Sequence, residues 1–189
     1  MALALRTALA TLVLTGLLYP AIVTACAQLL FRGRANGSLV RDADGSVIGS
    51  ALLGQRFAHP AYLQGRPSAS GYDATASGGS NLGPGSRALR ARARATLVRL
   101  RADNPLALGP VPAELLAASG SGLDPHLSPA AALWQVPRIA AARGVEPERV
   151  RAVIDAGIVG RDLGFLGEPR VDVLAVNRAL DVRFGRPER

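Results

Sequence analysis

The sequence contains no lysine, so its 22 basic residues are all arginine, and with 14 acidic residues the formal net charge is +8. A phosphate-binding Walker loop needs a lysine that reaches the phosphates. Enzymes that form a Schiff base with a carbonyl substrate use a lysine amine. Composition alone therefore excludes both classes of protein.

Cysteine and aromatic residues are also scarce. Cys26 is the only cysteine, so no intrachain disulfide can form, and aromatic residues make up 4% of the chain. The core of a soluble domain must then be built from Leu, Val, Ile and Ala. The length of 189 residues suits one soluble domain of about 150 residues with a short appendage. A domain of that size can bury a core without disulfides.

A long uncharged run lies near the N-terminus. Residues 7–31 carry no charged side chain. As a helix they would be about 37 Å long, which is enough to cross a hydrocarbon core of about 30 Å. We therefore predict a short N-terminal flank at residues 1–6 and a transmembrane helix at residues 7–31. Pro20 lies inside this run and removes a backbone hydrogen bond, so a local kink is expected there.

Two other interpretations of this run involve cleavage. Ala25-Cys26-Ala27 resembles the cleavage site of a secretory signal peptide. Val23-Thr24-Ala25-Cys26 resembles the box before a lipidated cysteine. Both interpretations expect the apolar stretch to end near Cys26, but it continues to Phe31. The pattern therefore favours a retained anchor.

The sequence alone does not decide the orientation of the anchor. Arg32, Arg34 and Arg41 follow the run and only Arg6 precedes it. A simple positive-inside count would place the following domain in the cytoplasm, but this rule weakens for long translocated domains.

The remainder predicts an α+β soluble domain, so the expected fold is such a domain with a single N-terminal transmembrane helix. Residues 35–56 suggest strands, with a hairpin turn at Asp44-Gly45. Residues 59–86 are rich in Gly, Ser and Pro, and their embedded tyrosines favour an ordered loop. Helices are then predicted over residues 87–101, over 128–143 with a break at Pro137, from Pro147, and from an Asp172 cap to about Phe184. Strands that precede helices indicate the α+β class, here over residues 32–189.

Few residues suggest chemistry. Ser119, Ser121, Asp124 and His126 lie in one short segment, but a serine hydrolase needs these groups to converge from separate elements. His59 and His126 lack ligand partners at metal-binding spacing. The backbone amides of the loop 77–81 are of a kind that can cradle an anion, but no clear helix start or basic partner follows directly, so the sequence favours a tight turn. The arginines of residues 87–101 scatter around a helix without interleaved aromatics, which indicates a solvated face rather than a nucleic-acid site.

Several segments, in order along nearly the whole chain, resemble the C subunit of the Kdp potassium-transporting ATPase of bacteria and archaea (the KdpC family). The matching segments are Thr15 to Pro20, Ala35 to Leu39, Gly65 to Ser68 with Gly71-Tyr72, Ala76 to Pro84, Ser119 to Pro129, Gly164 to Val171, and Asn177 with Ala179, Leu180 and Asp181.

The resemblance implies a set of partners and a place in the cell. The partners would be a potassium-selective, channel-like A subunit, an ATP-hydrolysing P-type B subunit, a small F subunit, and membrane lipid. The chain would cross the inner membrane once, with its N-terminus in the cytoplasm and its domain on the outer face. ATP and potassium would be handled by the complex, with no cofactor bound by this chain alone. The resemblance also implies that the chain raises the ATP affinity of the B subunit.

Within that family we expect a non-catalytic subunit that assembles and stabilises the complex. Since the chain carries a net charge of +8, which repels potassium, a structural role is favoured. The loops 76–84 and 119–129 are the expected partner contacts or structural loops, and their candidate residues are Gly78, Gly79, Ser80, Asn81, Ser119, Ser121, Asp124 and His126. The alternative is a free-standing exported lipoprotein or secreted binding protein whose ligand site is formed by these loops.

Overall fold

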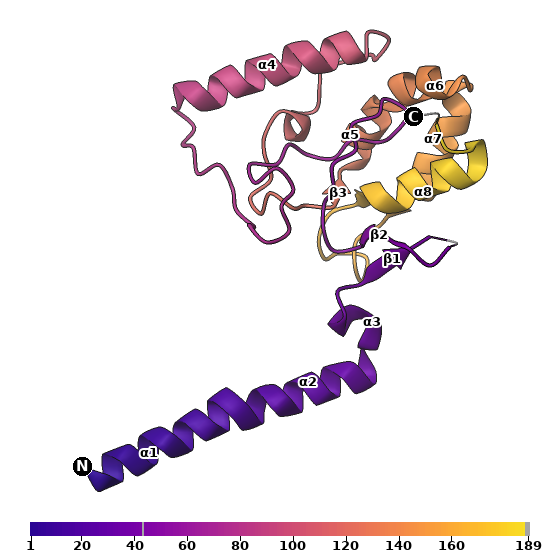
Figure 1. Cartoon of the computed structure of the whole chain (residues 1–189). Helices are drawn as coiled ribbons and strands as arrows, with labels where there is room; N and C mark the ends of the chain where they lie inside the picture. The colour runs from indigo at the N-terminus through magenta and orange to yellow at the C-terminus, as the bar shows by residue number, and fades with distance from the viewer. Residues whose placement is uncertain (43, 188–189) are drawn as a thin grey trace. The chain divides into compact units, whose positions relative to one another are not determined.

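The computed structural model describes residues 1–42 and 44–187, which form two compact units. The first unit is Met1–Ser50 and the second is Ala51–Arg189. Figure 1 shows the elements of both.

The first unit begins with a helix that is long and apolar enough to cross a membrane, Ala2–Leu30. It consists of α1 (Ala2–Val13), a π-helical turn η1 (Leu14–Leu18) and α2 (Tyr19–Leu30). The wider π turn lies directly before Pro20, whose nitrogen cannot donate a hydrogen bond, so the break in regularity falls where the sequence predicted it. The helix begins at Ala2, so it includes residues 2–6, which the sequence analysis assigned to a flank before the transmembrane helix. Its large apolar side chains are exposed, as expected for a surface that meets lipid.

A short helix and a hairpin complete this unit. α3 (Arg32–Ala35) is followed by β1 (Leu39–Arg41) and β2 (Val47–Ser50), which pair antiparallel with an irregularity after Val40. The Asp44 carboxylate accepts hydrogen bonds from the Ser46 hydroxyl and amide, at 2.7 and 2.9 Å, and these bonds lower its pKa. The predicted hairpin turn at Asp44-Gly45 is confirmed.

The helices of the second unit begin and end where local chemistry dictates. They are α4 (Arg87–Asp103), the 3₁₀ turn η2 (Ala113–Leu115), α5 (Pro129–Trp134), α6 (Val136–Arg143), α7 (Pro147–Ala156) and α8 (Val173–Phe184). Ser86, Ser128 and Asp172 cap α4, α5 and α8 by accepting a hydrogen bond from a first-turn amide. The predicted break at Pro137 is confirmed, since this residue cannot donate to the carbonyl four positions earlier.

A small antiparallel sheet joins three distant segments of this unit. β5 (Arg170–Asp172) lies between β3 (His126–Leu127) and β4 (Ile158–Val159). Val171 pairs with Leu127 on one side and Ile158 on the other, and it is fully buried. β3 and β4 have two residues each and are too short to show the alternation that predicts a strand from sequence.

The core lies between this sheet and the cluster of α5 to α8, where α7 contacts α5, α6 and α8. Figure 1 shows α4 apart from this cluster. In α4 only Leu100 is fully buried, while its arginines are exposed. The predicted solvated arginine face is therefore confirmed, and so is the expected fold class, a mixed helix and sheet body behind one N-terminal apolar helix.

Candidate functional site

The two loops that the sequence singled out lie against each other. The Gly78 amide donates to the Ser121 carbonyl at 2.8 Å, and the Ser77 hydroxyl donates to the same oxygen at 3.1 Å. Ser119 is buried, and its amide donates to the carbonyl of Pro67. We call residues 76–84 and 119–129 the paired loops. Each supplies hydrogen-bond partners for the backbone of the other, so their first role is within the chain.

Close backbone approach explains the glycines at this junction. A Cβ atom on Gly79 would lie 2.9 Å from the carbonyl oxygen of Gly120. Gly122 has φ +70°, and a Cβ there would lie 2.7 Å from the carbonyl oxygen of Gly78. By contrast, a Cβ on Gly78 would meet nothing within 4 Å. Ser80 is half-buried, and Asn81 is exposed with φ +51°. Gly79 and Gly122 are thus the positions where a side chain is excluded.

Asp124 is held by its neighbours in this loop. One carboxylate oxygen accepts from the His126 amide at 3.0 Å, and the other lies 3.2 Å from the guanidinium of Arg66. The His126 ring nitrogen Nδ1 lies 3.8 Å from Asp124. Ser121 uses its hydroxyl to accept from the Leu123 amide. These bonds fix the loop locally, and within the part of the chain that the structure describes no serine hydroxyl donates to His126.

An irregular segment, most of which lies in the predicted ordered loop, is bound to the helices by buried side chains. We call residues 58–67 the clasped segment. The Asn177 side chain accepts from the Leu63 amide at 2.7 Å and donates to its carbonyl at 2.9 Å. Gln135 makes the same pair of bonds with the backbone of Gln64, both at 3.0 Å. Two amide side chains thus replace the neighbouring strand that this backbone would otherwise need.

Two arginines also bind the backbone of the clasped segment, and we call these side chains together with Asn177 and Gln135 the clasp. Arg138 donates to the carbonyls of Pro60 and Tyr62 and to the side chain of Gln135. Burial lowers the pKa of Arg138 to about 10, so the side chain remains charged at neutral pH. Arg143 donates to the Ala61 carbonyl and forms a 2.8 Å ion pair with Asp181.

Tyr62 connects the clasped segment to the same ion pair. Its hydroxyl donates to Asp181 at 2.9 Å, and its ring lies under the Arg143 guanidinium. Burial raises the pKa of Tyr62, and the hydrogen bond to Asp181 raises it further. These contacts were not predicted from sequence, although Asn177 and Asp181 belong to the motif segments that carry the resemblance.

A second irregular segment presents large apolar side chains to solvent. We call residues 160–167 the exposed turn, in which Leu163, Phe165 and Leu166 are 82%, 69% and 49% exposed. Asp162 and Leu166 exchange two backbone hydrogen bonds of 2.9 Å across it. Arg161 and Glu168 close its base with an ion pair of 2.9 Å. Exposed apolar clusters of this kind mark interaction surfaces.

No group of three or more His, Cys, Asp or Glu side chains within residues 1–42 and 44–187 is placed to hold a metal ion. The paired loops are occupied by mutual hydrogen bonds, and the exposed turn carries no Ser, Thr, Cys, Lys or His. The feature that these segments present to solvent is the apolar surface of the exposed turn. Within residues 1–42 and 44–187, the fold defines a protein with one helix long and apolar enough to cross a membrane, followed by an α+β body.

Comparison with known proteins identifies the particular family. Residues 1–182 match the family model described as KdpC, the c chain of the K+-transporting ATPase. The chain belongs to this family, and it is a subunit of a K+-transporting ATPase. The resemblance drawn from the ordered motifs is confirmed.

Similar proteins named "Potassium-transporting ATPase KdpC subunit" come from several bacteria. A relative from Myxococcus xanthus is 62% identical over 184 residues, covering 96% of this chain and 87% of the relative. One from Caulobacter vibrioides is 56% identical over 174 residues, covering 91% and 87%. One from Methylobacterium nodulans is 51% identical over 187 residues, covering 92% of each. The alternative of a free-standing exported binding protein finds no support among them.

Proposed function

We propose that this chain is a non-catalytic accessory subunit that assembles and stabilises the ATPase complex through contacts of its body. The exposed turn carries this proposal, because three large apolar side chains stand on a backbone fixed by two hydrogen bonds and an ion pair. A preformed apolar tip loses little conformational freedom when it docks. The paired loops provide a second contact, since Asn81 and Ser121 are exposed at their surface.

The partners we propose are the channel-like A subunit, the ATP-hydrolysing B subunit and the small F subunit. The N-terminus would lie in the cytoplasm and the body on the outer face of the inner membrane. An effect on the ATP affinity of the B subunit would then have to pass through the anchor helix or the geometry of the complex. A C-terminal alkaline phosphatase fusion should be active, and an inactive but well-expressed fusion would contradict this orientation.

The role we propose is structural rather than ion-handling. The net charge of +8 opposes the accumulation of potassium. Asp124, an acid of the candidate site, is already neutralised by Arg66 at 3.2 Å. We therefore expect Asp124→Asn to leave the potassium affinity of the assembled complex close to that of the wild type. A sharply weakened potassium uptake by a normally assembled Asp124→Asn complex would show that the body handles the ion directly.

Recovery of the complex after mild detergent extraction tests the docking proposal. Phe165→Asp places a charge at the centre of the exposed turn and should lower recovery of the partner subunits about tenfold or more, because the charge would be buried on docking. Val182→Asp is the matched control, since Val182 is 89% exposed and belongs to α8 instead of the exposed turn. Equal recovery with both variants would contradict the proposed contact.

A further inference from the structure

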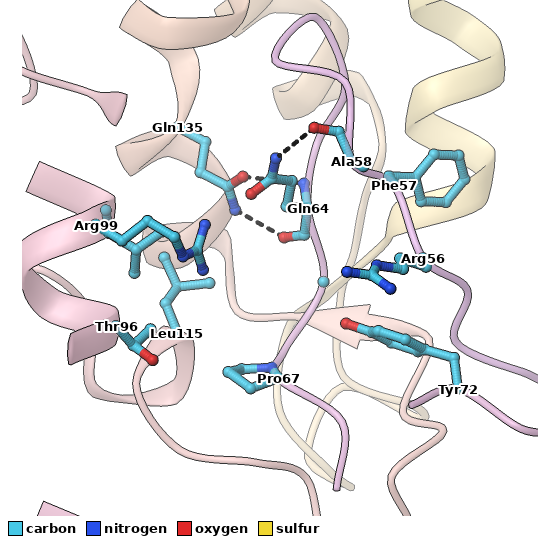
Figure 2. A pocket seen from close by; sticks show the side chains of 12 residues that line it. Arg56, Phe57, Ala58, Gln64, Pro67, Tyr72, Thr96, Arg99, Leu115 and Gln135 are labelled. Atoms are coloured by element: carbon cyan, nitrogen blue, oxygen red, sulfur yellow. Dashed lines mark hydrogen bonds between the residues drawn. The ribbon is translucent and has the colours of Figure 1, made fainter. Parts of the chain in front are cut away.

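A cleft of about 370 Å³ lies in the second unit, between the clasped segment, the turn η2 and the inner side of α4. Apolar side chains form much of its wall: Phe57, Pro67, Leu100 and Leu115. Its volume is within the range of small-molecule sites. Figure 2 shows the residues that surround it.

Two arginines lie on opposite sides of this cleft. In Figure 2 the guanidinium groups of Arg56 and Arg99 point toward each other across the open space. The charges of both arginines act on the Tyr72 hydroxyl and lower its pKa, although burial, the larger effect, raises it. Both cations thus act electrostatically on the same group of the wall.

No carboxylate lines the cleft, and of its two arginines only Arg99, through Asp103 outside the lining, has its charge offset by an ion pair in the described part of the chain. Among the described residues, Arg56 forms no ion pair, and Arg99 pairs only with Asp103, at 3.2 Å. The other polar groups are already used: Gln135 bonds to Gln64, and the Tyr72 hydroxyl donates to the Arg66 carbonyl at 2.6 Å. Within residues 1–42 and 44–187, the side-chain donors left over in the lining are those of Arg56, those of Arg99 that do not bond to Asp103, and the Thr96 hydroxyl.

We propose that this cleft binds an organic anion, with a phosphate or carboxylate group between Arg56 and Arg99 and an apolar part against Phe57 and Leu115. A guanidinium presents a planar fork of donors that matches either oxyanion, and two such forks can hold one group from both sides. The apolar walls favour a ligand with a carbon body over a free ion. This site is separate from the proposed docking of subunits, since it would bind a small molecule in the second unit of the chain.

Isothermal titration of the full chain in a neutral maltoside detergent, in a buffer without phosphate or carboxylate, tests the site. Phenyl phosphate is the probe for the organic anion, inorganic phosphate for the free ion, and phenol for the apolar part without charge. We expect saturable binding of phenyl phosphate that is tighter than that of inorganic phosphate, and no measurable binding of phenol. Failure of phenyl phosphate to bind, or equal binding of phenol or inorganic phosphate, would overturn the proposal.

Variants separate the cleft from the general positive charge of the protein. Arg56→Gln should weaken phenyl phosphate binding about tenfold or more, because one charge-assisted contact is lost. Asp103→Asn should strengthen it a few-fold, because Arg99 is released from its ion pair. Arg94→Gln is the matched control on the exposed face of α4, outside the cleft, and should change the affinity less than twofold. Equal losses in Arg56→Gln and Arg94→Gln would show nonspecific attraction and refute the site.

Discussion

The clasped segment and the exposed turn are both irregular, yet opposite kinds of interaction hold them. The backbone of Leu63 is buried, and the Asn177 side chain bonds to both of its polar groups. The exposed turn is closed at its surface by the ion pair between Arg161 and Glu168, which are 46% and 80% exposed. Buried hydrogen bonds are costly to leave unmade, whereas solvated ion pairs contribute little.

This difference separates stability from recognition. Where buried amide side chains bond to the backbone of a segment, replacing them destabilises the fold. The polar residues of the clasp therefore act in stability and not in recognition. A turn closed by surface ion pairs and two backbone hydrogen bonds can vary its side chains at little cost to folding. The apolar side chains of the exposed turn are therefore available for a partner, and mutations in the two segments should affect different measurements.

The largest effect is expected from Asn177→Leu in the clasp. The leucine would fill a similar volume but leave the amide and carbonyl of Leu63 buried without partners. We expect a loss of about 2 to 5 kcal/mol in the free energy of unfolding. Urea unfolding of the full chain in mild detergent, followed by the fluorescence of the single tryptophan, Trp134, measures it.

Gln64→Leu is the control for this variant. The side chain of Gln64 makes one long hydrogen bond, 3.4 Å to the Ala58 carbonyl, while its backbone keeps both bonds to Gln135. The loss should stay below about 1 kcal/mol. Similar losses in the two variants would mean that the clasp does not depend on buried amide pairing.

An intermediate effect is expected at the paired loops, from Gly79→Ala. The added Cβ would lie 2.9 Å from the Gly120 carbonyl oxygen, a backbone atom that cannot move without disturbing the loop. We expect a loss of about 1 to 3 kcal/mol in the same unfolding measurement. Gly78→Ala is the adjacent control, because its Cβ meets no atom within 4 Å, and it should not destabilise.

Recovery of the complex adds a second measurement at this junction. If the paired loops contact a partner, as the sequence analysis expects, a bulky residue at position 79 should also lower recovery of the complex. Full recovery with a destabilised Gly79 variant would restrict these loops to an internal role.

The sequence predicted helix starts, which depend on capping residues next to them in the chain. Ser128 with Pro129, and Asp172, marked helix starts that the structure confirms, because a cap needs only its own helix. The resemblance identified the family from ordered motifs. The contact of loop 76–84 with loop 119–129 did not follow from local patterns, although both loops were chosen, because no periodicity encodes a close approach between distant glycines.

The clasp and the cleft were beyond local patterns for a similar reason. Asn177 is far from Leu63 in sequence, and its importance depends on the burial of a backbone that makes no sheet. Arg56 and Arg99 come from a loop and a helix, and only the fold brings them to one cleft. The tyrosines of the loop 59–86 did indicate order, since a disordered linker would not retain such side chains.

The smallest effect is expected from Arg161→Gln at the base of the exposed turn. This change removes the ion pair with Glu168 but keeps the two backbone hydrogen bonds between Asp162 and Leu166. Because both side chains are largely solvated, the free energy of unfolding should fall by less than about 1 kcal/mol. A double-mutant cycle with Glu168→Gln, in low and high salt, measures the coupling between the two charges. A coupling above about 2 kcal/mol that salt does not change would mean that the exposed turn, like the clasped segment, stabilises the fold. A loss of complex recovery in Phe165→Asp could then result from a destabilised fold as well as from lost docking.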